Sequence, residues 1–401
     1  MKKGIATLLC GVLLLSACTS SRIQKLSLDT GSLSLKQAAV LNATLVDSIN
    51  DLTFKLQNEK DVTNVFSSGV SIYLALAMSA HGAAGETYRQ FIDLLAPGMK
   101  DQKSWLEDLR QLQGNLNAVA PTRISLANSI WMRDSFAKEV KASFLFRNTN
   151  YFGAMIAALD FSETQSVQEI NDWVKTNTNG RIIEAFSSID PATMMLLINT
   201  IYFKAVWQDE FKSKDTRAAI FHGKTDVTTK FMNRTGAYSY VDNDQYQAVL
   251  LPYSDGNTGM VVVLGKHETA PINDNETLKA LLQGLKTKTI RLSVPKVSIS
   301  TQEVLNSKLK SLGLVDAFTT ADFSELSSAN ELYISQVLHK TKLIIDEKGT
   351  EAAAMTVVTL DKTSIMVPDI TMMIDRPFQL FIVDLKNNLI LFNGIIQQVS
   401  D

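Results

Sequence analysis

Residues 343–369 read LIIDEKGTEAAAMTVVTLDKTSIMVPD, a stretch with conflicting secondary-structure signals. It begins as an apolar, strand-like run and reaches a turn-like cluster at Asp346-Glu347-Lys348-Gly349. From Thr350 the pattern is that of a helix, because a capping threonine and an acidic residue precede three alanines, the strongest helix formers. Thr356-Val357-Val358-Thr359 then favours β structure. A segment that can adopt helix, coil or strand is what a conformational switch requires.

The chain around this segment has the composition of a soluble globular protein. It has 401 residues, of which 45% are hydrophobic and 20% charged, and this excludes wholesale disorder, a collagen-like repeat and a polytopic membrane protein. Lys and Arg number 39 against 41 Asp and Glu, so no basic excess indicates a nucleic-acid partner. No linker, charge block or internal repeat divides residues 36–401, and we expect one large domain.

Helical signals come early in the chain and strand signals later. Leu45, Ile49, Leu52 and Leu56 recur at helical spacing, and two further helical segments are Val70–Met78, which is apolar nearly all round, and Gln168–Thr176. The strand-like runs are Met194–Phe203, Ala248–Pro252, Gly259–Leu264, Ile290–Val297, Glu331–Ile345, Phe378–Leu385 and Leu389–Ile395. This order, without alternation of strand and helix, predicts an α+β fold with mainly antiparallel sheets.

The first residues have the pattern of a bacterial lipoprotein signal. Lys2 and Lys3 precede a short apolar run that ends in Leu15-Ser16-Ala17-Cys18, which resembles a lipobox. We expect a signal peptide at 1–17, a lipidated N-terminus and tether at 18–35, and the folded domain at 36–401. Stable anchoring would need several acyl chains such as palmitate on the Cys18 terminus, in the bacterial cell envelope at the outer membrane or cell surface. The alternative is a plain signal peptide that contains Cys18.

The sequence contains no recognisable active site. Its four histidines, His81, His222, His267 and His339, are far apart in sequence. A Gly-x-Ser-x-Gly nucleophile motif is absent, and Ser307 with Lys310 has the spacing of a penicillin-binding motif without its companion triads. We therefore expect a protein that is not an enzyme and that needs no metal or other cofactor.

Sequence blocks along the whole chain resemble those of the serpin family, in the family's order. They are Asn64-Val65-Phe66-Ser67-Ser68-Gly69-Val70-Ser71-Ile72, Gly85-Glu86-Thr87, Asn171-Asp172-Trp173-Val174, Asn199-Thr200-Ile201-Tyr202-Phe203-Lys204, Leu251-Pro252-Tyr253, Val294-Pro295-Lys296, Val337-Leu338-His339-Lys340 and Arg376-Pro377-Phe378. Two departures are Gly69, where the family usually has proline, and the tail after Gly394, which lacks the usual Asn-Pro.

The resemblance implies a single domain of helices packed around a large central mixed β-sheet, with further antiparallel sheets and an exposed reactive-centre loop. It also implies a suicide-type inhibitor of extracytoplasmic serine endopeptidases, and also of cysteine endopeptidases. The protease cleaves the loop, and the loop then inserts into the central sheet while the protease is still bound as an acyl-enzyme. The alternative is a non-inhibitory serpin that serves as a binding or anchoring surface.

The family's hinge matches Glu347, Gly349, Thr350, Glu351, Ala352, Ala353 and Ala354. Because side chains alternate along a strand, Thr350, Ala352 and Ala354 would share one face, and Glu351 and Ala353 the other. Burial of an unpaired Glu351 carboxylate would be costly, so the face with the small residues is expected to be the inner one. No proline lies between Gly349 and Val367, so the new strand would keep its amide donors.

Further family positions match a shutter beneath the sheet opening, formed by Ser68, Ser71, Asn199 and His339, and a breach where the loop enters, with Trp207, Lys296 and Glu347. Neutral His339 is expected to bridge hydroxyl and amide groups. A Glu347–Lys296 ion pair is expected to help keep the sheet closed.

The cleaved bond is less sharply defined. Counting from the hinge gives Thr363-Ser364, whereas counting back from Arg376 points nearer Met366. Lys362 suits trypsin-like pockets and Thr363 suits elastase-like pockets, so proteases of both specificities are the expected partners. We expect a monomer that has no nucleic-acid partner and meets the membrane only through its lipid anchor.

Overall fold

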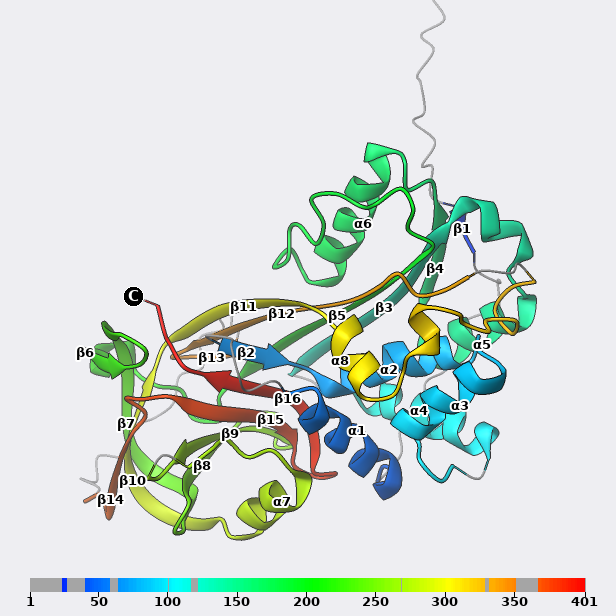
Figure 1. Cartoon of the computed structure of the whole chain (residues 1–401). Helices are drawn as coiled ribbons and strands as arrows, with labels where there is room; N and C mark the ends of the chain where they lie inside the picture. Colours follow the sequence, from blue (N-terminus) through cyan, green and yellow to red (C-terminus); the bar gives the residue numbers. More distant parts are fainter. Residues whose placement is uncertain are drawn as a thin grey trace, which may run out of the picture.

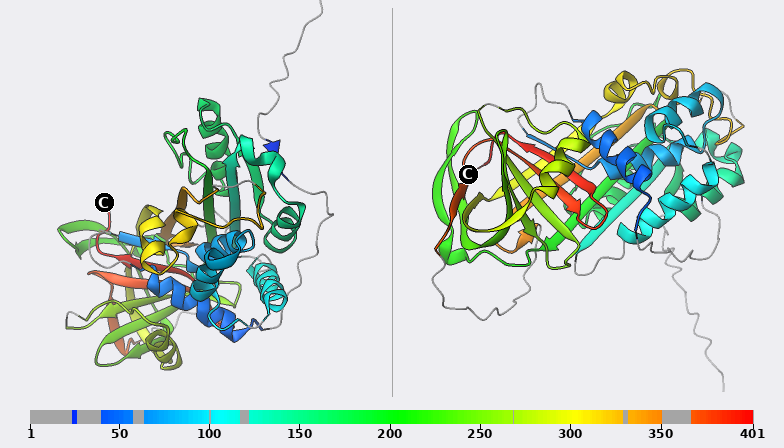
Figure 2. Two further views of the ribbon diagram at one scale, coloured as in Figure 1. Left: turned by 45° about the vertical axis from the view of Figure 1, so that its right-hand side comes forward. Right: turned by 90° about the horizontal axis from the view of Figure 1, so that it is seen from below.

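The computed structural model of the chain describes residues 24–26, 40–57, 64–99, 101–116, 122–267, 269–328, 332–350 and 367–400. Two large β-sheets form the centre of the molecule, and most of the helices gather at one end of it (Figures 1 and 2). The main hydrophobic core lies between the two sheets and the helices at that end, and a smaller cluster lies beneath helix α6.

The helices begin and end where local sequence signals allow. In the described ranges they are α1 (Ala43–Lys55), α2 (Gly69–Ala80), α3 (Gly85–Leu95), α4 (Gln102–Leu116), α5 (Ala142–Phe152), α6 (Thr164–Asn177), α7 (Asn275–Gln283) and α8 (Asn306–Ser311), with short 3₁₀ turns at Asp134–Glu139, Ser213–Asp215 and Asp316–Phe318. Asn42 caps α1 by accepting from the backbone amides of Thr44 and Leu45. Every residue of α2 is buried, as predicted for the run Val70–Met78, which is apolar nearly all round.

Within the described residues, seven strands form the first sheet, in the order β1-β4-β3-β5-β13-β12-β11. Their bounds are β1 (Gln24–Lys25), β3 (Arg123–Arg133), β4 (Met155–Leu159), β5 (Met195–Val206), β11 (Val297–Val304), β12 (Gln336–Asp346) and β13 (Gly349–Thr350). The sheet is mixed, because β3 pairs with β4, and β5 with β12, in parallel.

The two faces of β5 carry different layers of the molecule. Leu197 and Ile201 pack in the cluster that contains α2, whereas Leu196 and Ile198 pack in the cluster that contains α6. Odd-numbered residues of β5 therefore face the second sheet and α2, and even-numbered residues face α6, which lies above the sheet in Figure 1. This distinction decides which side of an inserted strand would be buried in the main core.

The second sheet has the described order β14-β10-β7-β8-β9-β15-β16-β2, and β6 also pairs with β7. The bounds are β2 (Asn64–Ser67), β6 (Arg217–His222), β7 (Asp226–Asp242), β8 (Tyr246–Pro252), β9 (Thr258–Gly265), β10 (Lys286–Pro295), β14 (Ile370–Met373), β15 (Phe378–Asp384) and β16 (Leu389–Ile396). Its pairs are antiparallel except β10–β14.

The predicted fold class is confirmed, and most predicted elements lie where the patterns indicated. One predicted strand is too long. The prediction was Glu331–Ile345, but the strand observed there, β12, begins only at Gln336. Residues 332–335 precede it as an irregular segment whose Leu332 and Ile334 are buried, so burial rather than strand pairing explains their apolar character. The 17-residue strand β7 was not predicted, because its polar residues interrupt the alternation.

Candidate functional site

The candidate site is the point where β5 and β12 separate. Gln336–Lys340 of β12 pair directly with Leu196–Thr200 of β5, but at the other end of these strands β13 lies between them. Gly349 is opposite Val206 on one side and Asp346 on the other, and Thr350 is opposite Ala205 and Ile345. The sheet is therefore closed at one end and already accommodates the first two hinge residues at the other.

A tight turn carries the chain from β12 into β13. The Asp346 carboxylate accepts hydrogen bonds from the backbone amides of Lys348 (2.9 Å) and Gly349 (3.2 Å), as an Asx turn does. A Cβ atom on Gly349 would lie 2.0 Å from the Ala205 carbonyl oxygen. Only glycine allows the two backbones to approach this closely, which explains the residue found at this hinge position.

Trp207 and Phe211 hold the turn from the far side. The Trp207 backbone amide donates to the Lys348 carbonyl (2.9 Å), and its indole Nε1 donates to the Asp346 carbonyl (3.0 Å). The Phe211 amide donates to the Glu347 carbonyl (2.9 Å). The Trp207 ring stacks on the Tyr253 ring at 4.7 Å with 6° between the planes. Trp207, which was predicted at the breach, therefore contacts the turn that carries the hinge directly.

The side chain of Thr350 points into the core and has one polar partner. Its hydroxyl lies 2.6 Å from the Tyr253 hydroxyl, and both side chains are buried. Burial also raises the pKa of Tyr253, opposed by the weaker effect of this hydrogen bond, so the phenol stays neutral. Thr350 lies on the inner face, as strand alternation predicted.

The expected ion pair at the breach is present. Lys296 Nζ lies 2.8 Å from Glu347 Oε2, and the Thr216 hydroxyl donates to Glu347 Oε1 at 2.9 Å. Burial tends to raise the pKa of Glu347, but the hydrogen bonds from Lys296 and Thr216 outweigh it and the pKa is lowered. The Lys296 side chain is 36% exposed, so the pair contributes at most about 1 kcal/mol.

Replacement of Tyr253 by phenylalanine should loosen the hinge. The Thr350 hydroxyl would remain buried without a partner, at a cost of about 1–3 kcal/mol, which is relieved when Thr350 leaves the sheet. We expect the amides of Gly349 and Thr350 to exchange with solvent deuterium about tenfold faster or more. Hydrogen-exchange mass spectrometry of the peptide that covers 345–350 measures this rate.

Tyr246→Phe is the matched control, because this buried tyrosine on β8 donates its hydroxyl to the Ala270 carbonyl (3.1 Å) and does not contact the hinge. Equal exchange of the hinge amides in both variants would show that the Tyr253–Thr350 hydrogen bond does not retain the hinge.

The four predicted shutter residues meet in one buried network beneath the closed part of the sheet. His339 Nε2 accepts from the Ser68 amide (3.1 Å), so its proton is on Nδ1, which donates to Asn199 Oδ1 (2.9 Å). The Ser71 hydroxyl donates to the same oxygen (2.7 Å), and Asn199 Nδ2 donates to the Ser71 carbonyl (2.8 Å) and to Asn128 Oδ1 (2.6 Å). His339 and Asn199 are also register partners across β12 and β5.

This network depends on a neutral imidazole. Burial lowers the pKa of His339 to about 3, with a smaller contribution from the charge of Lys308. His81, at the end of α2, is the second buried histidine, and burial lowers its pKa to about 3 as well, assisted by the charge of Arg147. Both groups bind a proton more weakly in the folded chain than in the unfolded chain.

The folded chain should therefore lose stability as the pH falls. A histidine whose pKa is lowered by folding stabilises the protein fully above its unfolded pKa of about 6.5, and this contribution disappears as the pH falls towards the folded pKa. Between pH 7 and pH 5 each buried histidine should account for a loss of about 2 kcal/mol in the free energy of unfolding. Urea titrations at the two pH values should show about half of this joint loss in His339→Gln.

His81→Gln provides the comparison, because His81 is the other buried histidine whose pKa burial lowers to about 3. It should remove a share of the pH-dependent loss similar to that removed by His339→Gln. An unchanged pH dependence in His339→Gln would contradict a neutral, buried imidazole in the shutter.

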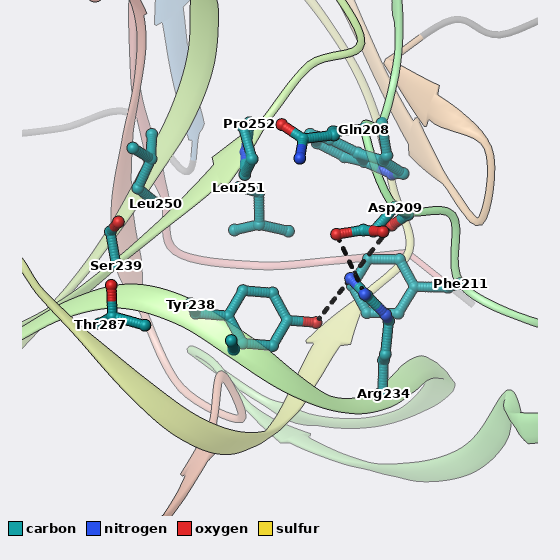
Figure 3. A pocket seen from close by; sticks show the side chains of 12 residues that line it. Gln208, Asp209, Phe211, Arg234, Tyr238, Ser239, Leu250, Leu251, Pro252 and Thr287 are labelled. Atoms are coloured by element: carbon teal, nitrogen blue, oxygen red, sulfur yellow. Dashed lines mark hydrogen bonds and ion pairs between the residues drawn. The ribbon is translucent and has the colours of Figure 1, made fainter. Parts of the chain in front are cut away.

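A small cavity of about 210 Å³ adjoins the breach, and Trp207, Phe211 and Pro252 contribute to its lining. Figure 3 shows Arg234 projecting between Asp209, at 3.1 Å, and the Tyr238 hydroxyl, at 3.5 Å. The volume of this cavity is below the 300–1,000 Å³ usual for small-molecule sites, and these three polar side chains already interact with one another. We assign it no ligand.

Three partners of the site were missed by sequence reasoning, namely Tyr253, Thr216 and Asn128. Tyr253 lies in a quoted family block, but no local pattern relates it to Thr350, 97 residues away. Gly69, noted as a departure, has a structural reason, since a Cβ atom there would lie 1.8 Å from Thr53 Oγ1 of α1. Several predicted positions lie outside the described residues: Cys18, Glu351, Ala352, Ala353, Ala354, Lys362, Thr363, Ser364 and Met366.

Two kinds of feature are absent from the described ranges. No helix in them is long and apolar enough to cross a membrane. No group of three or more His, Cys, Asp or Glu side chains in them could hold a metal ion.

Comparison with known sequences agrees with this geometry. A family model described as Serpin (serine protease inhibitor) matches residues 48–399. An uncharacterized serpin-like protein of Thermococcus kodakarensis is 32% identical over 375 residues, which cover 89% of this chain and 86% of the relative. The leukocyte elastase inhibitor of Equus caballus is 31% identical over 368 residues, with 85% and 95% covered.

Solved structures extend the likeness to three dimensions. The native state of tengpin, a thermophilic serpin, superposes with a TM-score of 0.81 at 29% identity and covers 92% of this chain and 98% of that one. Human thyroxine-binding globulin, solved in complex with thyroxine, gives 0.80 at 28% identity, with 90% and 100% covered. Sequence match, fold and the hinge seated in the sheet agree: the chain belongs to the serpin family.

Proposed function

We propose that this serpin is a suicide-type inhibitor of extracytoplasmic serine endopeptidases. The observation that supports the proposal best is β13, because Gly349 and Thr350 already pair with both β5 and β12 at the open end of the sheet. A loop that must enter a sheet needs an entry point with free hydrogen-bonding edges on both sides. The two hinge residues occupy such a point and set the register of what would follow.

The register of β13 indicates which residues an inserted loop would meet. Thr356 would lie between Asn199 and His339, which are now direct partners in the shutter. Insertion would therefore separate β5 from β12 at the shutter and replace the pairs between them. Leu360 would reach Met195, the first residue of β5.

The faces of the strand also fit. Inserted residues with even numbers would pair with odd-numbered residues of β12, and Val337, His339, Thr341, Leu343 and Ile345 are all buried. Ala352 and Ala354 would thus enter the main core, where small side chains fit without overpacking. Glu351 would lie on the opposite face beside Lys204, so its carboxylate would gain a cation there.

A binding protein without inhibitory activity is the competing function, and thyroxine-binding globulin, a structural neighbour, was solved in complex with thyroxine. The two are separated by incubating the chain with a trypsin-like and an elastase-like protease. An inhibitor should give a covalent complex that survives detergent, whose mass is that of the protease plus the chain less its released C-terminal peptide. Cleaved chain with fully active protease would exclude the inhibitory function.

Specificity should divide between two neighbouring residues. Lys362→Ala should abolish inhibition of trypsin-like enzymes, which need a cation in their specificity pocket, and leave elastase-like inhibition largely intact. Thr363→Arg should do the reverse. Cleavage one residue earlier shortens an inserted strand by only about 3.3 Å, so both bonds should permit trapping. Second-order inhibition rates with each protease measure the effect.

Sequencing of the released C-terminal peptide shows which bond was cut. If Lys362→Ala inhibits trypsin as well as the parent chain does, trypsin must cleave another bond. The bond after Met366 would be the next to test.

We further propose that the protein is anchored in the bacterial cell envelope through lipid on Cys18. The support is the sequence pattern at 15–18 alone. Labelling of growing cells with an alkyne analogue of palmitate should tag the chain, and Cys18→Ser should remove both the label and the membrane association. A labelled Cys18→Ser chain would contradict this site.

A further inference from the structure

A second cavity, of about 910 Å³, lies on the nine-stranded sheet and shares no lining residue with the cavity at the breach. Its walls come from the turn between β6 and β7, the paired ends of β8 and β9, and the paired ends of β15 and β16. The volume falls within the range of small-molecule sites. The inhibitory function proposed above uses none of these residues.

The interior of this cavity is apolar. Val263 and Ile395 line it, are each at most 5% exposed and share one face of the sheet as register partners of Gln379, so they form a fixed floor. Pro271 and Pro377 complete the apolar surface at the sides. A ligand that fits here should carry an apolar body.

The wall at Thr269–Ile272 is held in place by hydrogen bonds rather than by a ligand. Gln379 accepts from the Ile272 amide (2.8 Å) and donates to the Ile272 carbonyl (3.0 Å), and Tyr246 donates to the Ala270 carbonyl (3.1 Å). His267 adopts a left-handed conformation with φ 48°, which closes the turn at the start of this wall. The cavity is therefore largely preformed, which reduces the entropy lost when a ligand binds.

The charged side chains at the rim of the cavity indicate which polar group a ligand should carry. None of the described residues that line the cavity is acidic, whereas Lys224, Lys266 and Arg376 are basic. Lys266 is paired with Asp242 and Arg376 with Asp375, at 3.2 Å for the latter. Lys224 forms no ion pair within the described part of the chain. Of these three cations, Lys224 is the one left to pair with a ligand, and a single cation suits a single carboxylate better than a polyanion.

We propose that this cavity binds a small amphipathic monocarboxylate, whose apolar body lies against Val263, Ile395 and Pro271 and whose carboxylate pairs with Lys224. A ligand in this position would contact both the β6–β7 turn and the segment that follows β14. The His222 amide already donates to the Asp375 carbonyl (2.7 Å) between these two segments. Binding should therefore raise the melting temperature of the full chain.

Isothermal titration calorimetry of the full chain with decanoate tests the proposal. We expect saturable binding of one decanoate per chain, and no binding of acetate, which lacks the tail, or of decyltrimethylammonium, which has the opposite charge. Lys224→Glu should weaken decanoate binding at least tenfold. Lys103→Glu, which changes an exposed lysine on α4 away from the cavity, should leave it unchanged.

Occlusion and labelling provide independent checks. Ala270→Trp, at an exposed lining position, should fill the cavity and abolish binding. If that variant does not fold, a photoreactive decanoate analogue on the parent chain should label peptides from 263–271 or 376–379. Equal binding of decanoate and the alkylammonium, unchanged affinity in Lys224→Glu, or labelling elsewhere would overturn the proposal. These results concern ligand binding alone and do not depend on whether the chain inhibits a protease.

Discussion

Cleavage of the chain between Leu360 and Ser364 should raise its melting temperature by about 10 °C or more. Insertion would add backbone hydrogen bonds along both β5 and β12, each with a net value of about 0.5–1.5 kcal/mol, and would bury Ala352 and Ala354 in the main core. A net gain of about 10 kcal/mol would move the midpoint by roughly 10–15 °C, because the entropy of unfolding of a domain of about 365 residues is about 0.8 kcal/mol/K. Nicking an ordinary folded protein has no effect or a destabilising one.

The measurement is a thermal melt before and after limited proteolysis, with the cut mapped by mass spectrometry. A cut at the exposed Ile183, in the described segment after α6, is the control, because it releases no strand that could insert and should not raise the midpoint. An unchanged melting temperature after a verified cut between Leu360 and Ser364 would remove the inhibitory function.

Ala354→Arg should convert the inhibitor into a substrate. In the register of β13, residue 354 would face inward beside Thr341, whose side chain is fully buried. An arginine there must either stay out of the sheet or be buried without a partner, and both slow insertion. Deacylation then finishes first and releases active protease. We expect the number of inhibitor molecules consumed per trapped protease to rise more than tenfold.

Ala353→Arg is a closely matched control, because it introduces the same side chain one residue away on the opposite face. Its register partner on β12 is Lys342, whose side chain is only partly buried, so the new cation can reach solvent. This variant should remain an inhibitor. Equal behaviour of the two variants would show that the assignment of the inner face is wrong.

Local sequence signals predicted the burial of a residue correctly where that burial depends on its neighbours along the chain. The run Val70–Met78, which is apolar nearly all round, predicted a buried helix, and α2 is one. Alternation predicted that Thr350 faces inward, and it does. The expected bridging by His339 is present for amide groups only, because its ring contacts the Ser68 backbone amide and the Asn199 side chain. The hydroxyls of Ser68 and Ser71 donate to the Leu391 carbonyl and to Asn199 instead.

The tertiary structure decided how distant segments meet. The antiparallel pattern expected from strand-like runs did not indicate that β5 and β12 pair in parallel, although this pairing creates the edge that β13 enters. Tyr253 and Thr350 are 97 residues apart, and neither position carries a local sign of the other. Such pairings depend on the free energy gained when two distant segments pack together in the folded chain. Propensity and periodicity describe only the preferences of one segment at a time. The sequence by itself thus determined a hinge able to become a strand, and only the packing of β5, β12 and Tyr253 determined where that strand begins.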